Sequence, residues 1–364
     1  MARLRRDWPK RGYWWLYRLW RNRRWETLVL VQIALIWLLY WSWPPVTLTL
    51  VLPAGEVSYW QETIQRFEAD HRRIRIRPVG VASPQEDITV KIRDLCSFDA
   101  GRSPCDIVYL DVIWVAEMAS EGWLQDLSGK VDAADLAAFV GSEVAAGRYQ
   151  GGLYRVPFRA DFGLLYYRAD LLQQAGYRLP QTYDELLTKA QALQGLGQNG
   201  PRWGYLWQAQ QEGLITTFVE VLQGHGGYWI DPDTQAVGLD QPEAIAAVQF
   251  LRRTIELGIS PPLDQTYGDT AAVEAFMAGE TAFMRHWPWV TNAAGDRLAM
   301  NPQAQRVPMT LHAPGETGGG CKGSWGLGIA RRSPHPRQAW QAVQYLTSAA
   351  SQRHFAEQTG YIPS

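Results

Sequence analysis

Short apolar runs alternate with amphipathic stretches along most of the chain, starting at residue 46. Val46 opens an almost entirely apolar run, VTLTLVL, which is typical of a buried first strand. Trp60, Ile64 and Phe67 then recur at helical spacing. This pattern predicts strands over residues 46–52, 74–79 and 106–110, and helices over 60–70, 87–95 and 112–122. The alternating order favours a mostly parallel sheet with helices on both faces.

The second part of the chain continues as a mixture of helices and strands. Thr182 and Glu185 form a capping box that opens a helix. Helices are predicted over residues 169–175, 182–196, 213–224, 242–257, 270–278, 336–347 and 350–359. Strands are predicted over residues 153–156, 163–167, 281–284 and 323–330. An α/β fold class follows from both parts together.

The N-terminal segment differs from the rest of the chain. Residues 28–43, LVLVQIALIWLLYWSW, carry no charge, and nine Lys or Arg residues precede them. With Thr27 the run just reaches the length needed to cross a hydrocarbon core of about 30 Å. We predict a basic cytoplasmic segment over 1–26 and a transmembrane signal anchor over 27–43, with the body exported. A cleaved signal peptide is the alternative, but no A-x-A site follows the run.

Charge and motif content exclude several classes of function. Residues 46–364 hold 26 basic and 34 acidic side chains, so this body has no basic surface suited to nucleic acid. The six histidines show no metal-ligand spacing, and the sequence has no G-x-S-x-G motif. We therefore expect no metal, no cofactor, no nucleic-acid partner and no enzymatic activity.

The three cysteines are Cys96, Cys105 and Cys321, without a C-x-x-C motif. Cys96 and Cys105 bracket SFDAGRSP, a segment rich in turn-forming residues. Because export permits disulfides, we expect a Cys96–Cys105 bond, with two separate buried thiols as the alternative. Cys321 is given no chemistry.

Several longer stretches appear in a fixed order over most of residues 48–364. They include YWQETIQRFEADHRRIRI (59–76), DIVYLDVIWVAEMASEGWLQDLS (106–128), RVPFRADFGLLYYRADLLQQAGY (155–177) and GSWGLGIARRSPHPRQAW (323–340). Residues 268–289 also contain the pattern F-x-x-G-x-x-A-x-x-x-x-x-P-W. Together these stretches resemble the extracellular solute-binding proteins of ABC importers, in the branch that binds maltose, trehalose and glucosylglycerol.

The resemblance implies a two-lobed periplasmic-binding-protein fold of type II with a hinge, preceded here by the N-terminal transmembrane helix. It also implies that relatives run on for several dozen residues after a sequence such as GYIP, so the last residues should be a truncated tail. The expected division is lobe 1 over 46–155, lobe 2 over 156–312, a return to lobe 1 over 313–347 and a truncated lobe 2 tail over 348–364.

Candidate ligand contacts combine acids at loop positions with aromatic side chains. Asp111 ends a strand, where α/β sheets open into a ligand crevice, while Glu56 follows the first strand and Asp161 stands beside Arg159. The resemblance places Trp287, Trp289 and Trp325 at sugar-stacking positions, although core packing is the alternative for each. The full candidate set is Glu56, Asp111, Arg159, Asp161, Trp287, Trp289, Gly323, Ser324 and Trp325.

The expected function is binding of a small oligosaccharide or glycoside of the trehalose, maltose, sucrose or glucosylglycerol type, for import by an ABC permease. The protein is expected to be a monomer at the extracytoplasmic face of the cytoplasmic membrane. Three other interpretations remain: a membrane-tethered sugar sensor, a binder of another solute such as a polyamine or phosphodiester, and a glycosidase that pairs two of the carboxylates.

Overall fold

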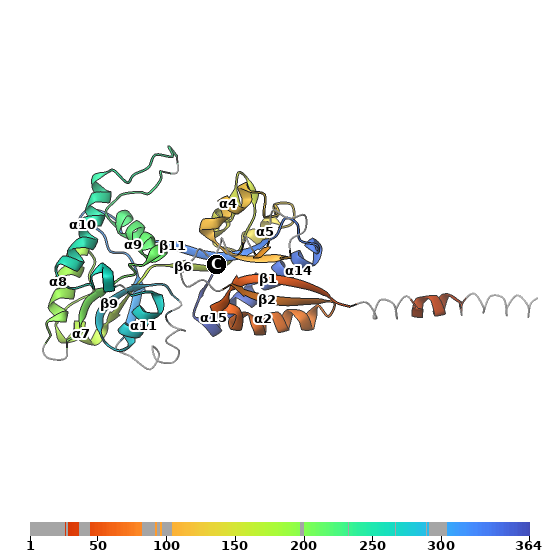
Figure 1. The fold of residues 1–364 in the computed structure, drawn as a ribbon, viewed down its shortest axis with the longest axis horizontal. Helices are drawn as coiled ribbons and strands as arrows, with labels where there is room; N and C mark the ends of the chain where they lie inside the picture. The colour runs from red at the N-terminus through yellow and green to blue at the C-terminus, as the bar shows by residue number, and fades with distance from the viewer. Residues whose placement is uncertain are drawn as a thin grey trace, which may run out of the picture.

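The computed structural model describes residues 26, 28–35, 44–81, 92, 95–96, 104–196, 200–231, 233–265, 267–288, 290 and 304–364. Within these ranges no helix is both long and apolar enough to cross a membrane. Residues 28–35 are helical, but most of the anchor predicted over 27–43 lies outside the described residues. The same holds for the helix predicted over 87–95. From residue 46 onward the chain forms two lobes, each around its own sheet (Figure 1).

The first lobe contains a six-stranded sheet in the order β12-β6-β11-β3-β1-β2. Its strands are β1 (Val46–Pro53), β2 (Ile74–Val81), β3 (Ile107–Asp111), β6 (Val156–Phe162), β11 (Lys322–Ile329) and β12 (Ile362–Pro363). Its helical segments are η1 (Ala54–Glu56), α2 (Val57–Asp70), η2 (Val112–Trp114), α4 (Val115–Ser120), α5 (Ala133–Leu136), α6 (Gly141–Ala146), α14 (Pro336–Leu346) and α15 (Ala349–Thr359). A short hairpin joins β4 (Arg148–Tyr149) to β5 (Gly152–Leu153).

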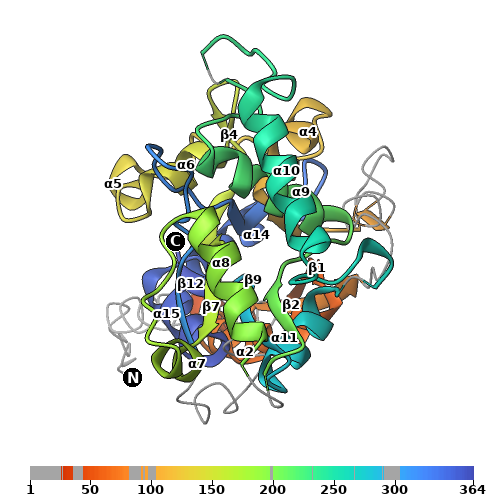
Figure 2. The ribbon, with the colours of Figure 1, turned by 90° about the vertical axis from the view of Figure 1, so that its left-hand side faces the viewer.

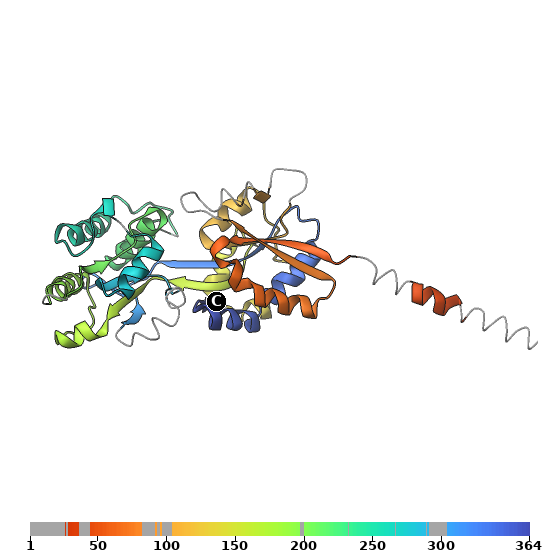
Figure 3. The same cartoon turned by 60° about the horizontal axis from the view of Figure 1, so that its bottom comes forward.

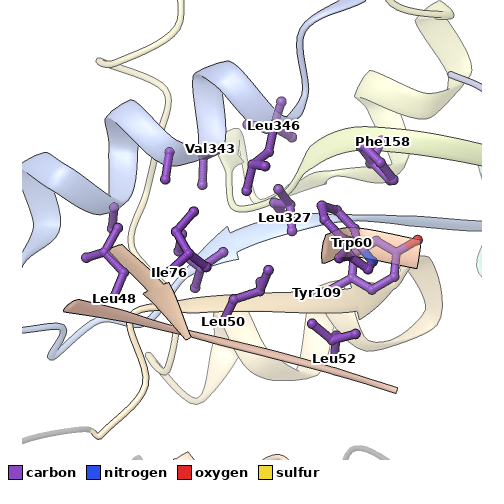
Figure 4. Packing of buried hydrophobic residues seen from close by; sticks show 14 of the residues in the cluster. Leu48, Leu50, Leu52, Trp60, Ile76, Tyr109, Phe158, Leu327, Val343 and Leu346 are labelled. Atoms are coloured by element: carbon purple, nitrogen blue, oxygen red, sulfur yellow. The ribbon is translucent and has the colours of Figure 1, made fainter. Parts of the chain in front are cut away.

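Strand β1 is buried on both faces, which explains its almost continuous apolar sequence. Leu48, Leu50 and Leu52 pack into one core with α2 and α14, whereas Val51 faces a second core beside α4. Trp60 from α2 is fully buried and stacks on Phe158, with 4.5 Å between ring centroids. Figure 4 shows Leu48, Leu50 and Leu52 pointing into the first core. Alternation within the strand therefore places helices on both sides of the sheet.

The C-terminal segment corrects one expectation. Residues 348–364 belong to the first lobe and not to a tail of the second, because α15 packs against α2 and β12 pairs with β6. Phe355 is buried in the first core, where its ring lies 5.3 Å from that of Trp60. Figure 1 shows α15 beside α2. The apolar side chains of α15 thus complete the core around Trp60.

The second lobe contains a four-stranded sheet in the order β10-β7-β9-β8. Its strands are β7 (Leu164–Arg168), β8 (Trp203–Leu206), β9 (Thr281–His286) and β10 (Ala304–Pro308). Its helical segments are α7 (Ala169–Gln174), α8 (Tyr183–Gln194), α9 (Gln211–Gly224), α10 (Pro242–Glu256), η3 (Leu263–Gln265) and α11 (Asp269–Met277). The predicted cap is present, since the Glu185 amide donates to the Thr182 hydroxyl over 3.2 Å. Figure 2, seen from this end of the molecule, shows α8 and α10.

Both sheets are mixed, which corrects the expectation of mostly parallel pairing. Strand β1 pairs in parallel with β2 and β3, but β11 runs antiparallel to both β3 and β6. In the second lobe, β7 runs antiparallel to β9 and β10. The reason is that the chain enters and leaves the second lobe along neighbouring strands, which must run in opposite directions.

The two lobes are joined by β6 and β11, which lie side by side between them (Figure 3). Strand β6 remains in the first sheet through Phe162, and β7 of the second sheet begins at Leu164. The chain therefore passes from the first lobe to the second at Gly163 and not at residue 156. We call each place where the chain passes between the lobes a crossing. The return crossing is at Cys321, directly before β11, and not at residue 313. Cys96 and Cys105 form a disulfide in the first lobe, with Cα atoms 5.2 Å apart.

Candidate functional site

Strand register brings most of the predicted residues to one face of the sheet. Trp325 of β11 lies opposite Asp111 of β3 on one side and opposite Arg159 of β6 on the other. Gly323 lies opposite Asp161. Side chains two residues apart on a strand share a face, so Arg159 and Asp161 point to the same side as Trp325. The sheet therefore gathers these groups beside the two crossings.

Arg159 is the centre of a buried ion cluster. Its Nη2 lies 3.1 Å from Glu56 Oε1, and its Nε lies 3.3 Å from Asp161 Oδ2. The exposed fractions are 4% for Arg159, 8% for Glu56 and 6% for Asp161. Glu56 reaches this point because η1 follows the end of β1 directly. One guanidinium thus joins acids from two segments far apart in the sequence.

Burial controls the protonation behaviour of this cluster. It raises the pKa of Glu56 and of Asp161, because a carboxylate loses solvation there, and the nearby Arg159 only partly offsets this rise. Burial also opposes charge on Arg159, but Asp161 and Glu56 together raise its pKa above the usual value. The guanidinium therefore remains charged while the two acids are held less strongly in their ionised form.

Three aromatic rings surround the guanidinium of Arg159. Its central carbon lies 3.8 Å from the ring centre of Tyr361, 5.3 Å from that of Trp325 and 5.7 Å from that of Tyr109. Trp325 is half-buried, and its ring centroid lies 5.0 Å from that of Tyr109. Such contacts are favourable because the face of an aromatic ring attracts a cation. The aromatic groups therefore fix where the charged group lies.

Several polar atoms of this cluster have no partner. Within the part of the chain that the structure describes, Glu56 Oε2, Asp161 Oδ1, Arg159 Nη1 and the Tyr109 hydroxyl are buried and make no hydrogen bond. Each such atom costs about 1–3 kcal/mol when it is withdrawn from water without compensation. Acceptors and donors for a polar ligand are thus present together, beside the aromatic surface of Trp325.

Asp111 and Ser324 are buried and already engaged. Asp111 Oδ1 accepts a hydrogen bond of 3.2 Å from the amide of Ile113, which caps η2. The Ser324 hydroxyl accepts one of 2.9 Å from Arg155, whose guanidinium also lies 3.1 Å from Glu143. These contacts give both residues a local structural role at the edge of the ion cluster.

Trp287 reaches the same place from the second lobe. It follows β9, and its half-buried ring would lie 3.4 Å from a Cβ placed on Gly323. The indole therefore lies in van der Waals range of β11 at Gly323. The guanidinium carbon of Arg285 lies 4.1 Å from the Trp287 ring centre on the second-lobe side. Trp289 lies outside the described residues.

Two residues of the site were missed by the sequence analysis. Tyr109 lies within the third strand, where its neighbours are all buried, and nothing in the alternation distinguishes it from a core residue. Tyr361 belongs to a segment assigned to the other lobe. Its position follows from Gly360, whose φ of 67° ends α15 and turns the chain into β12 beside β6.

The described residues include no group of His, Cys, Asp and Glu side chains that could hold a metal ion. A groove of about 630 Å³ on the first lobe is lined by residues of α5, α14 and α15, together with Pro363 and Ser364. It contains none of the predicted site residues. Most of the predicted polar and aromatic groups lie instead at the ion cluster beside the crossings.

Comparison with known proteins identifies the family of the chain. The family described as bacterial extracellular solute-binding protein matches residues 53–353. The chain belongs to this family. Among the relatives of this solute-binding protein, a probable ABC transporter-binding protein of Deinococcus radiodurans is 33% identical over 271 residues, which are 73% of this chain and 63% of that protein. The maltotriose-binding protein of Pyrococcus abyssi is 26% identical over 269 residues, covering 72% of this chain and 55% of that protein. This solute-binding protein thus spans less than two thirds of the length of either relative.

A solved structure extends the likeness to the fold. The maltose-bound MalE3 of T. maritima has a TM-score of 0.78 and 31% sequence identity to this solute-binding protein. The match covers 87% of this chain and 81% of that one. A match of this extent is larger than either lobe alone, so the two-lobed α/β architecture is shared.

Proposed function

We propose that this solute-binding protein binds a small neutral oligosaccharide or glycoside between its lobes and delivers it to an ABC permease. The observation that carries the proposal is the group of four buried polar atoms without partners on Glu56, Tyr109, Arg159 and Asp161. Sugar hydroxyls both donate and accept, so they can satisfy a carboxylate, a phenol and a guanidinium together. The apolar C–H face of a sugar ring stacks on an indole such as that of Trp325 or Trp287.

The charge of the cluster favours a neutral ligand. Arg159 is already bound to two carboxylates, so its positive charge is matched before any ligand arrives. A phosphorylated or carboxylated solute would meet the negative charges of Glu56 and Asp161, while Arg159 is already engaged by both. Like charges at close range cost several kcal/mol. A polyol avoids this penalty.

The same geometry disfavours glycoside hydrolysis. A glycosidase needs one protonated and one ionised carboxyl group with room between them for the scissile bond. Here the guanidinium of Arg159 lies between Glu56 and Asp161 and contacts both. Two carboxylates held by one cation suit hydrogen bonding to hydroxyls and not acid–base chemistry on a bond between sugars.

The relatives narrow the choice of sugar. The MalE3 structure of T. maritima carries maltose, and the relative in Pyrococcus abyssi is named for maltotriose. We therefore place α-linked glucose disaccharides and trisaccharides first for this chain. Trehalose, sucrose and glucosylglycerol offer similar hydroxyl patterns and belong in the same test.

We further propose that the protein acts as a monomer at the outer face of the cytoplasmic membrane. The uncharged run over 28–43, after nine basic residues, supports an N-terminal anchor over 27–43 with residues 1–26 in the cytoplasm. An anchored binding domain remains close to its permease, which raises the effective concentration of sugar-loaded protein there.

Thermal unfolding of the full chain in the presence of different solutes tests the proposed function. The detergent must lack a sugar headgroup, because a maltoside would compete for the site. A ligand bound only by the folded state, present at one hundred times its dissociation constant, adds about 2.7 kcal/mol of stability. We expect a concentration-dependent rise in Tm with maltose, maltotriose or another neutral glycoside. A rise only with glycerol phosphate or spermidine would contradict the proposal.

A further inference from the structure

A second buried ion cluster lies in the other lobe, behind Trp287. Arg285 of β9 and Glu220 of α9 are 0% and 1% exposed. The guanidinium donates through Nε and Nη2 to the two oxygens of Glu220, over 3.2 and 2.9 Å. Its Nη1 donates to Gln208 Oε1 over 2.6 Å. This bidentate arrangement fixes the orientation of the guanidinium plane.

The same carboxylate contacts both connections between the lobes. Glu220 Oε2 accepts a hydrogen bond of 2.9 Å from the amide of Cys321, the residue directly before β11. Gly163, the single residue between β6 and β7, packs so closely on Glu220 that a Cβ there would overlap with the carboxylate. The Gly163 amide also donates to the Cys321 carbonyl over 3.1 Å. One side chain of α9 therefore fixes the place where each strand enters the second lobe.

The partner of this carboxylate supports the aromatic platform. The Arg285 guanidinium carbon lies 4.1 Å from the ring centre of Trp287, within range of a cation–π contact. On another side, the Trp287 ring lies against Gly323 of β11. Contacts therefore run from Trp287 through Arg285 to Glu220, and from Glu220 to Gly163 and Cys321.

A requirement for stability alone does not account for such a pair. Desolvation of two charges offsets most of their attraction, and an apolar replacement of similar volume is often as stable or more stable. What an apolar replacement cannot supply is a set of directed hydrogen bonds to a backbone amide and to a fixed guanidinium. The arrangement therefore points to a geometric role.

We propose that Glu220 and Arg285 are positioning residues that hold Trp287 beside Gly323 and tie it to both interlobe crossings. Sugar stacking on Trp287 would then act directly on the segments about which the lobes turn. The sugar-dependent part of this inference rests on the proposed function. The part that concerns the crossings does not, because it follows from contacts within the chain.

The test uses the full chain in a detergent without a sugar headgroup, under non-reducing conditions. The variants are E220Q, which retains shape but loses charge, and R285K, which retains charge but loses the fork. The control is T254V, since Thr254 is fully buried in the same lobe and accepts a hydrogen bond of 3.0 Å from Trp207, far along the chain from the crossings. Each protein is assayed for Tm, for the reaction rate of the Cys321 thiol with an aromatic disulfide reagent, and for maltose affinity by calorimetry.

We expect E220Q to raise the Cys321 reaction rate about fivefold or more. Glutamine has one acceptor oxygen for the three donors that Glu220 accepts from, so the strand is held less firmly and opens locally more often. Maltose affinity should fall about tenfold, since Trp287 loses its support. R285K should also raise the Cys321 reaction rate and lower the maltose affinity, by smaller factors. If E220Q does not fold, R285K provides the test of the proposal. T254V should lower Tm while leaving both quantities within about twofold of wild type.

The inference is overturned if E220Q and R285K lower Tm as T254V does but leave the thiol rate and the maltose affinity unchanged. The pair would then serve only the stability of the second lobe. If the wild-type chain binds no sugar, the proposed function fails instead, and the thiol rate in the absence of sugar still decides whether Glu220 fixes the crossing at Cys321.

Discussion

The ring of Tyr361 covers the guanidinium of Arg159 at 3.8 Å from ring centre to central carbon. Tyr361 is contributed by the last few residues of the chain, whereas Arg159 lies on the strand that leads into the second lobe. The end of the chain therefore closes over the one cation that joins Glu56 to Asp161. This places the C-terminal segment within the site as well as within the core of the first lobe.

Removal of that cation should be costly. R159M leaves two carboxylates buried without their shared partner, and breaking a buried pair typically costs about 3–5 kcal/mol. R252M is the matched control, because Arg252 pairs with Glu256 at an exposed helical position where a pair contributes about 0–1 kcal/mol. Urea unfolding measures both changes. Equal losses in the two variants would mean that Arg159 is not a structural centre.

Trp325 should contribute to ligand affinity more than to folding. W325A removes the half-buried indole beside Tyr109, which we expect to stack on the sugar ring. A stacking contact of an aromatic ring is worth about 0.5–1.5 kcal/mol beyond the area it buries. Because the variant also loses the apolar surface that the indole buries against the sugar, maltose affinity should fall by about one to two orders of magnitude. W229A serves as the control, since Trp229 is 37% exposed and packs on Phe218 in the second lobe. Calorimetry showing the same affinity in W325A as in W229A would argue against stacking.

The ion cluster should make stability depend on pH with a definite sign. Burial raises the pKa of Glu56 above its ordinary value of 4.5, so the folded state binds this proton more tightly than the unfolded state does. Stability from this group is therefore greatest at acidic pH, and it falls as pH rises from about 4.5 through the raised pKa. E56Q cannot titrate at this position.

The difference in unfolding free energy between wild type and E56Q isolates that contribution. It should favour the wild type most at low pH and decline as pH increases. Denaturant unfolding of both proteins across pH 4 to 8 measures it. Carboxyl groups distant from the cluster cancel in the subtraction, whereas Asp161, whose charge acts on Glu56, contributes together with it. A difference that grows with pH would mean that the Arg159 cation outweighs desolvation and lowers the pKa of Glu56.

The C-terminal helix should be essential to the first lobe. Phe355 is buried among Trp60, Phe158 and Tyr361, so F355A should cost about 3–5 kcal/mol of unfolding free energy. F355L retains most of the volume and should cost about 1.5 kcal/mol or less. Denaturant unfolding gives both values. A loss below 1 kcal/mol for F355A would contradict the placement of α15 in this core.

The pattern of apolar positions located most helices and strands, because each of them buries the residues along a given face in the same core. The strand starting at Val46 and the helix carrying Trp60, Ile64 and Phe67 follow their periods closely. Strand β6 was missed, since PFRADF places Arg159 and Asp161 at buried positions where a strand normally carries apolar groups. The pattern is broken there because those positions belong to the ion cluster.

The location of the tail and the partners of the ion cluster depend on long-range pairing. No local signal indicates that β12 pairs with β6, because two residues contain too little pattern to identify a strand. The sequence analysis selected Arg159 only because it stands beside Asp161. Its ion pair with Glu56 joins residues about one hundred positions apart, and no local pattern indicates such a pair. Glu220 and Arg285 went unnoticed because each occurs singly within an apolar segment.

Isothermal titration of the full chain with maltose, in parallel with an E56Q/D161N double variant, tests the central claim most directly. The double variant keeps the size of both side chains but replaces the carboxylate oxygens that lack partners. The account predicts one maltose bound per wild-type chain, and affinity at least about one hundredfold weaker in the variant, since each lost charged hydrogen bond costs about 1.5–3 kcal/mol. Equal affinity in the two proteins, with both folded, would contradict it.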